Sequence, residues 1–92
     1  MKQSIFEIRS NEALTDSVYR MVLVGDTSDI TNCGQFVNIQ LEGMFLRRPI
    51  SVCDYDEETL TIVYKVVGKG TEAMSAMAPG QELYILTGLG NG

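Results

Sequence analysis

Short β-type segments that recur about every ten residues are the feature that most constrains the fold of this chain. They are rich in β-branched and aromatic residues and are separated by glycine, proline, asparagine and aspartate. Six short strands in one small domain favour a closed antiparallel barrel, because closure removes unpaired edges that so short a chain could not otherwise cover. The expected strands are residues 4–9, 17–24, 35–41, 50–53, 59–67 and 82–86.

The expected strand at 35–41 has the clearest alternation of polar and apolar side chains. Its inner face is expected to consist of Phe36, Val37, Ile39 and Leu41, with Val37 out of phase. The two-residue periodicity therefore predicts which side chains of this strand face the core and which face solvent.

Residues 71–78 break the β pattern and favour one short helix. Met74 and Met77 lie at helical spacing, and we expect them to pack in the core rather than to contact a cofactor. Thr71 is a suitable N-cap, and Glu72 places a carboxylate in the positively polarised first turn. The predicted fold is therefore all-β: a six-stranded antiparallel barrel with one short helix.

The chain has 92 residues and 45% hydrophobic content, which is enough for one domain with a single core. Its formal net charge of −5 argues against nonspecific binding to nucleic acid or to an anionic membrane. No segment has the character of a signal peptide or a membrane span. We therefore expect a cytoplasmic protein without nucleic-acid or membrane partners.

The sequence has 12 Asp and Glu residues, but no pair of them has a context that suggests acid–base catalysis. Histidine is absent, which excludes an ordinary zinc site and a histidine-based catalytic triad. Cys33 and Cys53 are too few for a disulfide framework, and we expect both to be small, buried or half-buried hydrophobic residues. The carboxylates of residues 54–58 are expected at a solvated hairpin end. We therefore expect neither catalytic side chains nor a metal site, and infer that the chain holds a cofactor.

Arg47 and Arg48 stand directly before Pro49 and an apolar segment. Guanidinium groups bind phosphate well, and proline favours an extended backbone at the residue before it. Ser51 adds a hydroxyl and a backbone N–H that could meet a flat heterocycle beside the phosphate. The alternative is that both arginines are ordinary surface charges before an edge strand.

The turn Gly68-Lys69-Gly70-Thr71 follows one expected strand and opens the expected helix, so its N–H groups could bind an anion. It has neither the Walker nor the Rossmann spacing, and a purely structural turn is the alternative. The segment from Tyr64 to Val67 could line a flat ring. Otherwise Tyr64 is a core aromatic residue and Lys65 a solvated strand cation.

Four motifs occur in one order: Gly34-Gln35-Phe36, Arg48-Pro49-Ile50-Ser51, Gly68-Lys69-Gly70-Thr71 and Leu89-Gly90-Asn91-Gly92. Together they resemble the flavin-binding domain of the ferredoxin–NADP reductase superfamily, and most closely the electron transfer subunits of class 1B dihydroorotate dehydrogenases. Each motif is weak alone, but the ordered set is specific, and the resemblance covers the whole chain. It implies a six-stranded Greek-key barrel that binds FAD.

The resemblance assigns one part of the FAD site to the arginine motif. Arg48 is implied to contact the diphosphate, and Pro49 belongs to the same binding motif. Ile50 and Ser51 are implied to lie at the isoalloxazine, with Ser51 near N5. The broader superfamily usually has tyrosine where Ile50 stands, so stacking of a phenol ring on the flavin is not available here.

The resemblance assigns the second part of the site to the turn after the fifth expected strand. Gly70 and Thr71 are implied to hold the diphosphate from the start of the helix. Val66 and Val67, together with Lys65, are implied to line the flavin or its ribityl chain.

In the family, the Leu-Gly-Asn-Gly motif leads into a nucleotide-binding domain and a cysteine-rich [2Fe–2S] segment. Residues 1–92 are therefore expected to be an FAD-binding β-barrel domain, with NAD-binding and [2Fe–2S] domains downstream. The implied partner is a dihydroorotate dehydrogenase catalytic subunit, in a heterotetramer. The implied function is electron relay between NAD and that subunit in pyrimidine biosynthesis, and the isolated domain is expected to be inactive.

Two alternatives belong beside this interpretation. One is the FAD domain of a related ferredoxin-linked NADPH oxidoreductase subunit, which shares these motifs. The other is a non-enzymatic small β-barrel that serves as an interaction or oligonucleotide-binding module. That module would need exposed aromatic residues on a basic face, which this acidic chain with few aromatic residues does not favour.

The resemblance predicts that Arg48→Ala weakens FAD binding strongly and leaves the fold intact, because a charge-assisted contact is lost rather than core packing. Arg47→Ala is the matched control and is expected to have a smaller effect. FAD titrations of the two variants measure the difference. Unchanged affinity in Arg48→Ala would refute the role assigned to this arginine.

Overall fold

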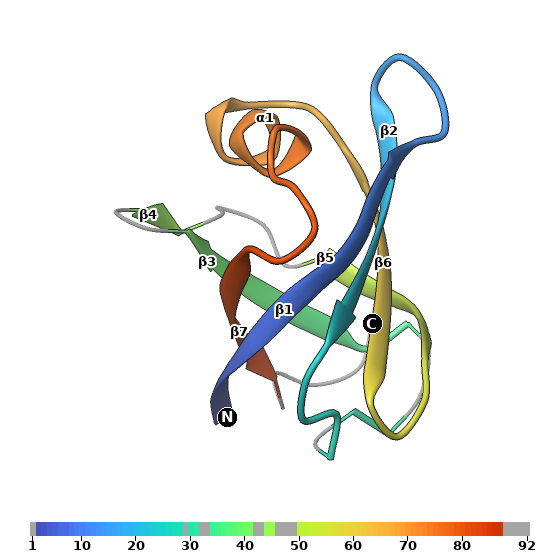
Figure 1. Cartoon of the computed structure of the whole chain (residues 1–92), viewed down its shortest axis with the longest axis vertical. Coiled ribbons are helices and arrows are strands. Elements are labelled where there is room, and N and C mark those ends of the chain that lie inside the picture. Colours follow the sequence, from blue (N-terminus) through green and yellow to red (C-terminus); the bar gives the residue numbers. More distant parts are fainter. Residues whose placement is uncertain (1, 29, 32–33, 42–43, 46–49, 88–92) are drawn as a thin grey trace.

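A computed structural model of the chain describes residues 2–28, 30–31, 34–41, 44–45 and 50–87 (Figure 1). The strands in this part of the chain occur in the order expected from the sequence, with one short addition. They are β1 (Lys2–Ala13), β2 (Val18–Val24), β3 (Phe36–Leu41), β4 (Met44–Phe45), β5 (Ile50–Tyr55), β6 (Thr59–Lys65) and β7 (Glu82–Thr87). The helix α1 (Lys69–Ser75) lies between β6 and β7 in the chain.

Six of the described strands form a closed ring in the order β3-β5-β6-β2-β1-β7, and β7 pairs back onto β3. Every pair in the ring is antiparallel. Among the described strands, β4 pairs only with the end of β3, so it lies outside the ring. These pairings confirm the predicted six-stranded antiparallel barrel with one short helix.

The connections give this barrel a Greek-key topology. The strands β3, β5 and β6 are neighbours in that order, and β7 returns beside β3 after the connection that contains α1. In Figure 1, α1 lies over one end of the barrel, while the turn between β5 and β6 lies at the other. One end of the barrel is therefore covered by a helix, and the other carries a hairpin turn.

The core lies inside the ring and follows the period of two along each strand. On β6, for example, Leu60, Ile62 and Tyr64 are buried while Val63 and Lys65 are exposed. The buried apolar side chains of the described residues are Phe6, Ile8, Met21, Leu23, Ile30, Val37, Ile39, Val52, Leu60, Ile62, Tyr64, Met74, Leu83 and Ile85.

The expected inner face of β3 was right for Val37 and Ile39, but the prediction that Phe36 faces inward and that Val37 is out of phase was wrong. Val37 and Ile39 are both fully buried, whereas Phe36 is only half-buried and lies outside the core cluster. Adjacent apolar residues satisfy either phase of a two-residue pattern, and here the strand directs Val37 inward. Phe36 is therefore the residue out of phase.

The first strand runs further than the sequence predicted. Residues expected to be turn material continue β1 to Ala13, and they pair with the start of β2. A β-bulge between Ile8 and Ser10 shifts the register, and such bulges increase the local bend and twist. The turn closes where Leu14 N–H donates to Val18 O at 2.7 Å.

The helix begins earlier than expected. Its N-cap is Gly68 and its first residue is Lys69, so the prediction of Thr71 as N-cap was wrong. Thr71 is the third helical residue and reaches back toward the N-cap. The predicted role of the two methionines was right, because Met74 is fully buried and Met77 packs against the core.

The prediction of a buried or half-buried Cys53 was also wrong, because Cys53 is exposed. It lies at a bulge in β5 between Val52 and Asp54, where the pairing with β6 changes register. Cys33 lies outside the described residues. The carboxylates at 54–58 are exposed at the β5–β6 hairpin, as predicted.

No helix within the described ranges combines the length and hydrophobicity required to cross a membrane.

A close approach at Gly25 makes a test of core packing possible. A Cβ at this position would lie 2.7 Å from Cδ2 and 2.8 Å from Cγ of Phe6, whose side chain is fully buried. We expect Gly25→Ala to lower the free energy of unfolding by about 1–3 kcal/mol, because the ring cannot move without disturbing the core. Chemical denaturation followed by far-UV circular dichroism would measure the change in the free energy of unfolding.

Gly68→Ala provides the control. A Cβ at Gly68 would meet no atom within 4 Å, and the φ of −173° is extended backbone that any residue adopts. Its cost should stay below about 1 kcal/mol, the loss expected at an N-cap. Equal costs for both variants would show that the contact with Phe6 does not limit this position.

Candidate functional site

The strand register brings the start of β5 close to the end of β6. These strands are antiparallel, with Val52 opposite Ile62 and Tyr55 opposite Leu60, so their far ends lie together beneath α1. The predicted cofactor residues that the structure describes all lie at this end of the barrel: Ile50, Ser51, Lys65, Val66, Val67, Gly70 and Thr71. Arg48 and Pro49 lie outside the described residues.

The strand-borne part of this group presents partly exposed apolar surface. Ile50 and Val66 are half-buried and pack against the core, whereas Val67 is 66% exposed. Ser51 and Lys65 are exposed and carry a hydroxyl and a cation. Apolar walls with a few polar groups are the usual lining for a flat organic ligand.

These residues are held by the sheet itself. Ile50 and Ser51 pair with Val37 and Phe36 of β3. The N–H of Val66 donates to the backbone oxygen of Ser17 at 2.7 Å, which extends the β6–β2 ladder beyond the last strand residue. Ile50 and Val66 are therefore fixed by the strands, without help from α1.

The turn between β6 and α1 is closed by the side chain of Thr71. Its Oγ1 accepts the N–H of Val67 at 2.9 Å and the N–H of Gly68 at 3.2 Å. The hydroxyl in turn donates to the backbone oxygen of Gly68 at 3.2 Å. Thr71 therefore uses its side chain within the turn, and its backbone N–H is the group it can offer to a ligand.

The first amides of α1 complete this turn. The N–H of Glu72 donates to Gly68 O at 2.9 Å, which is the first hydrogen bond of the helix. The N–H groups of Lys69, Gly70 and Thr71 precede it and have no acceptor within the helix. Exposed Lys69 is the first residue of α1 and carries a positive charge beside these amides, and exposed Lys65 is the last residue of β6.

Asn11 joins α1 to the barrel, and sequence reasoning missed it. Its Nδ2 donates to the backbone oxygens of Met74 at 2.8 Å and Met77 at 3.0 Å. Its Oδ1 accepts the hydroxyl of Tyr64 at 2.8 Å. The partners are 53 to 66 residues away in the chain, so no local pattern could have indicated the contact.

Tyr64 is the buried end of this network. Its side chain is 4% exposed, and its ring stacks on Tyr19 with centroids 5.8 Å apart. Burial raises the pKa of Tyr64 to about 12, and the hydrogen bond to Asn11 opposes part of that shift. Tyr64 is thus a core aromatic residue, the alternative that the sequence left open.

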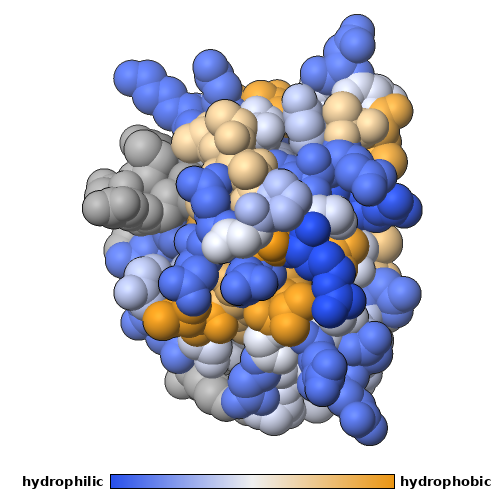
Figure 2. Space-filling view, in the orientation of Figure 1, coloured by the Kyte–Doolittle hydropathy of each residue, from blue (hydrophilic) through white to orange (hydrophobic). Residues whose placement is uncertain are grey.

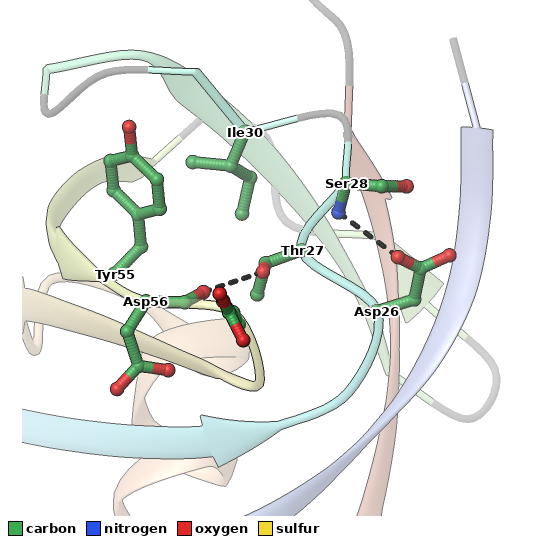
Figure 3. Close-up of a pocket in the computed structure, with 7 residues that line it drawn as sticks. Asp26, Thr27, Ser28, Ile30, Tyr55 and Asp56 are labelled. Carbon is green, nitrogen blue, oxygen red and sulfur yellow. Dashed lines mark hydrogen bonds between the residues drawn. The ribbon is translucent and has the colours of Figure 1, made fainter.

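An open depression lies at the opposite end of the barrel, away from the predicted cofactor residues (Figure 3). Thr27 lines it and donates its hydroxyl to the backbone oxygen of Asp56 at 2.6 Å. The N–H groups of Glu58 and Thr59 lower the pKa of Asp56. Asp26, Asp56 and Glu57 make this lining acidic, which does not suit a phosphate-containing ligand.

The outer face formed by β1 and β7 carries apolar side chains across its middle, surrounded by polar and charged ones (Figure 2). Ile5 and Tyr84 pair across these strands and are 51% and 47% exposed. This face is separate from the group beneath α1.

Comparison with known proteins identifies relatives over the whole chain, although no family model matches it. The chain is 40% identical over 96 residues to the dihydroorotate dehydrogenase B (NAD(+)), electron transfer subunit of Enterococcus faecalis OG1RF, covering 99% of the chain and 36% of that protein. It is 37% identical over 98 residues to the subunit of the same name from Bacillus pumilus, covering 100% of the chain and 38% of that protein. The chain is therefore homologous to these electron transfer subunits and spans little more than a third of their length.

Two solved structures share the fold. The flavohemoglobin of Malassezia yamatoensis, determined with bound FAD and heme, superposes with a TM-score of 0.75 at 21% identity, covering 95% of this chain and 25% of that one. The siderophore-interacting protein of Acinetobacter baumannii gives a TM-score of 0.71 at 13% identity, covering 94% and 40%. Both likenesses support the barrel architecture described above.

The raised pKa of Tyr64 predicts a loss of stability in strong alkali. The folded protein holds this proton up to about pH 12, whereas the unfolded chain releases it near pH 10.0. The contribution is complete below the lower value and is lost as the pH rises through the higher one, on the order of 2 kcal/mol in all. Urea denaturation between these pH values would measure the decline.

Tyr64→Phe isolates this contribution, because it keeps the ring and removes the ionisable group. Its free energy of unfolding should fall less steeply with pH than that of the unsubstituted protein. Tyr84→Phe changes a half-exposed tyrosine and serves as the control. Parallel pH profiles for the protein and Tyr64→Phe would contradict the assignment.

Proposed function

We propose that this chain, a homologue of dihydroorotate dehydrogenase B electron transfer subunits, is the FAD-binding part of such a subunit. In this role it takes part in electron relay between NAD and a dihydroorotate dehydrogenase catalytic subunit in pyrimidine biosynthesis. The observation that carries the proposal is that the predicted cofactor residues described by the structure gather at one end of a Greek-key barrel.

The residues present fit the chemistry of FAD. Half-buried Ile50 and Val66, with exposed Val67, offer apolar surface for the isoalloxazine and the ribityl chain. Ser51 is exposed beside Ile50 and offers a hydroxyl and a backbone N–H at the ring, for which we propose a position near N5. FAD supplies the redox chemistry when bound, and the protein supplies binding and orientation.

The diphosphate part of FAD requires hydrogen-bond donors and positive charge. The backbone N–H groups of Gly70 and Thr71 are donors of this kind, and the hydroxyl of Thr71 holds the turn that presents them. Lys69, the first residue of α1, adds a cation beside them, and we place Lys65 with Val66 and Val67 along the flavin or its ribityl chain. We assign the remaining charge to Arg48, next to Pro49, on the strength of the sequence motif.

The larger assembly is also part of the proposal. The relatives are named as NAD(+)-linked electron transfer subunits, and this chain corresponds to 36% to 38% of their length. We therefore place NAD binding and the [2Fe–2S] cluster in the remainder of such a subunit. The partner is a dihydroorotate dehydrogenase catalytic subunit in the cytoplasm.

FAD binding is the direct test. The visible absorption spectrum of the purified protein is expected to show bound flavin, or to convert added FAD to a bound spectrum. Val67→Glu should weaken binding by about tenfold or more, because a carboxylate at this exposed position would face the ligand. Titration of FAD followed by flavin absorption would measure both.

Ile5→Glu is the matched control, since Ile5 is also exposed but lies on the outer face of β1, separate from the group beneath α1. It should bind FAD as the unsubstituted protein does. Thermal unfolding of both variants should confirm that the barrel remains intact. A protein that leaves the FAD spectrum unchanged would contradict the proposed function, and equal binding by both variants would contradict the placement of the flavin.

A further inference from the structure

We infer that Asn11 is a positioning residue for FAD: it fixes α1 on the barrel and thereby places the amides of Gly70 and Thr71. The inference rests on the proposed function. The contacts of Asn11 link a strand at one side of the barrel with the last turn of the helix. Asn11 itself does not belong to the predicted cofactor residues.

The hydrogen-bond pattern fixes the orientation of the Asn11 amide. The backbone oxygens of Met74 and Met77 can only accept, so the NH2 group must face the helix. The side-chain oxygen then faces Tyr64, whose hydroxyl donates to it at 2.8 Å. Tyr64 is buried and stacked on Tyr19, which gives Asn11 a rigid support.

The helix needs such an attachment. With seven residues, α1 is too short to be stable without tertiary contacts. Burial of Met74 supplies apolar packing, but packing alone does not set the rotation of a helix about its axis. Within the described part of the chain, Asn11 supplies the side-chain hydrogen bonds that join a barrel strand to the end of α1.

The two halves of the proposed FAD site are therefore held by different means. Ile50 and Ser51 are fixed by pairing with β3, and Val66 by its hydrogen bond to Ser17. Gly70 and Thr71 lie in the first turn of α1, which Thr71 ties to Val67 and Gly68 and whose other end is held by Asn11. Losing the Asn11 contacts should displace the diphosphate half of the site and leave the flavin half in place.

Asn11→Asp separates these effects. The substitution keeps the side-chain shape and an acceptor for the Tyr64 hydroxyl, but it replaces the donor facing Met74 and Met77 with a carboxylate oxygen. The probes are FAD and riboflavin, which carries no phosphate. We expect the dissociation constant of FAD to rise about tenfold and that of riboflavin to change less than about twofold.

Gln3→Glu is the matched control, because it makes the same amide-to-carboxylate change on β1 far from α1. There the amide donates to Oε1 of Gln40 across an exposed surface, at 2.9 Å. Its ratio of FAD to riboflavin affinity should equal that of the unsubstituted protein. Tyr64→Phe, which removes the hydroxyl that orients Asn11, should change the ratio in the same direction and by less.

Amide hydrogen exchange gives a second readout that needs no ligand. In Asn11→Asp, the amide of Glu72 should exchange faster, while the amides within the β2–β6 ladder should keep their protection. Unchanged exchange at Glu72 would overturn the attachment itself. If Asn11→Asp weakened the binding of FAD and of riboflavin equally, Asn11 would have only a general structural role. That result would overturn the inference but not the proposed function. An unsubstituted protein that binds neither ligand would overturn both.

Discussion

The pairing of β7 with β3 is the interaction on which the rest of the structure depends. Asn38, Ile39 and Gln40 pair with Leu86, Ile85 and Tyr84, and this ladder converts an open sheet into a closed barrel. Closure surrounds side chains such as Ile39 and Ile85 on all sides. It also obliges the chain to cross from β6 to β7 over one end of the barrel, which is where α1 lies. That crossing carries Val66, Val67, Gly70 and Thr71 of the proposed FAD site.

Much of the fold could be predicted because each strand carries its own pattern. Segments rich in β-branched residues between turn residues indicated all the ring strands, and the methionine spacing indicated the helix. The wrong predictions concern features that the local sequence pattern does not determine. Two adjacent apolar residues left the phase of Phe36 and Val37 undetermined, and a bulge carried Cys53 to the surface. The polar end of β1 gains its β structure from pairing with β2, which a local pattern does not encode.

The candidate site shows the same division. Local motifs predicted Ile50, Ser51 and the turn at Gly70 as site residues. The antiparallel register of β5 and β6 places these residues at one end of the barrel. The role of Arg48 remains a prediction from the motif. No sequence pattern indicated the role of Asn11, because its hydrogen-bond partners lie on a helix and a strand far along the chain. The carboxylates of Asp26, Asp56 and Glu57 line the depression at the far end, whereas α1 carries both a lysine, Lys69, and a carboxylate, Glu72.

The position of β7 between β1 and β3 has a consequence for how the chain acquires its structure during synthesis. The strands β1 to β6 can pair among themselves as they leave the ribosome, but the outer edges of that sheet, β1 and β3, stay unpaired until residues 82–87 arrive. Contacts between the first and last strands give the barrel a high contact order, which slows folding. A nascent chain halted before β7 would expose two strand edges and the apolar interior, the features that recruit chaperones and promote aggregation.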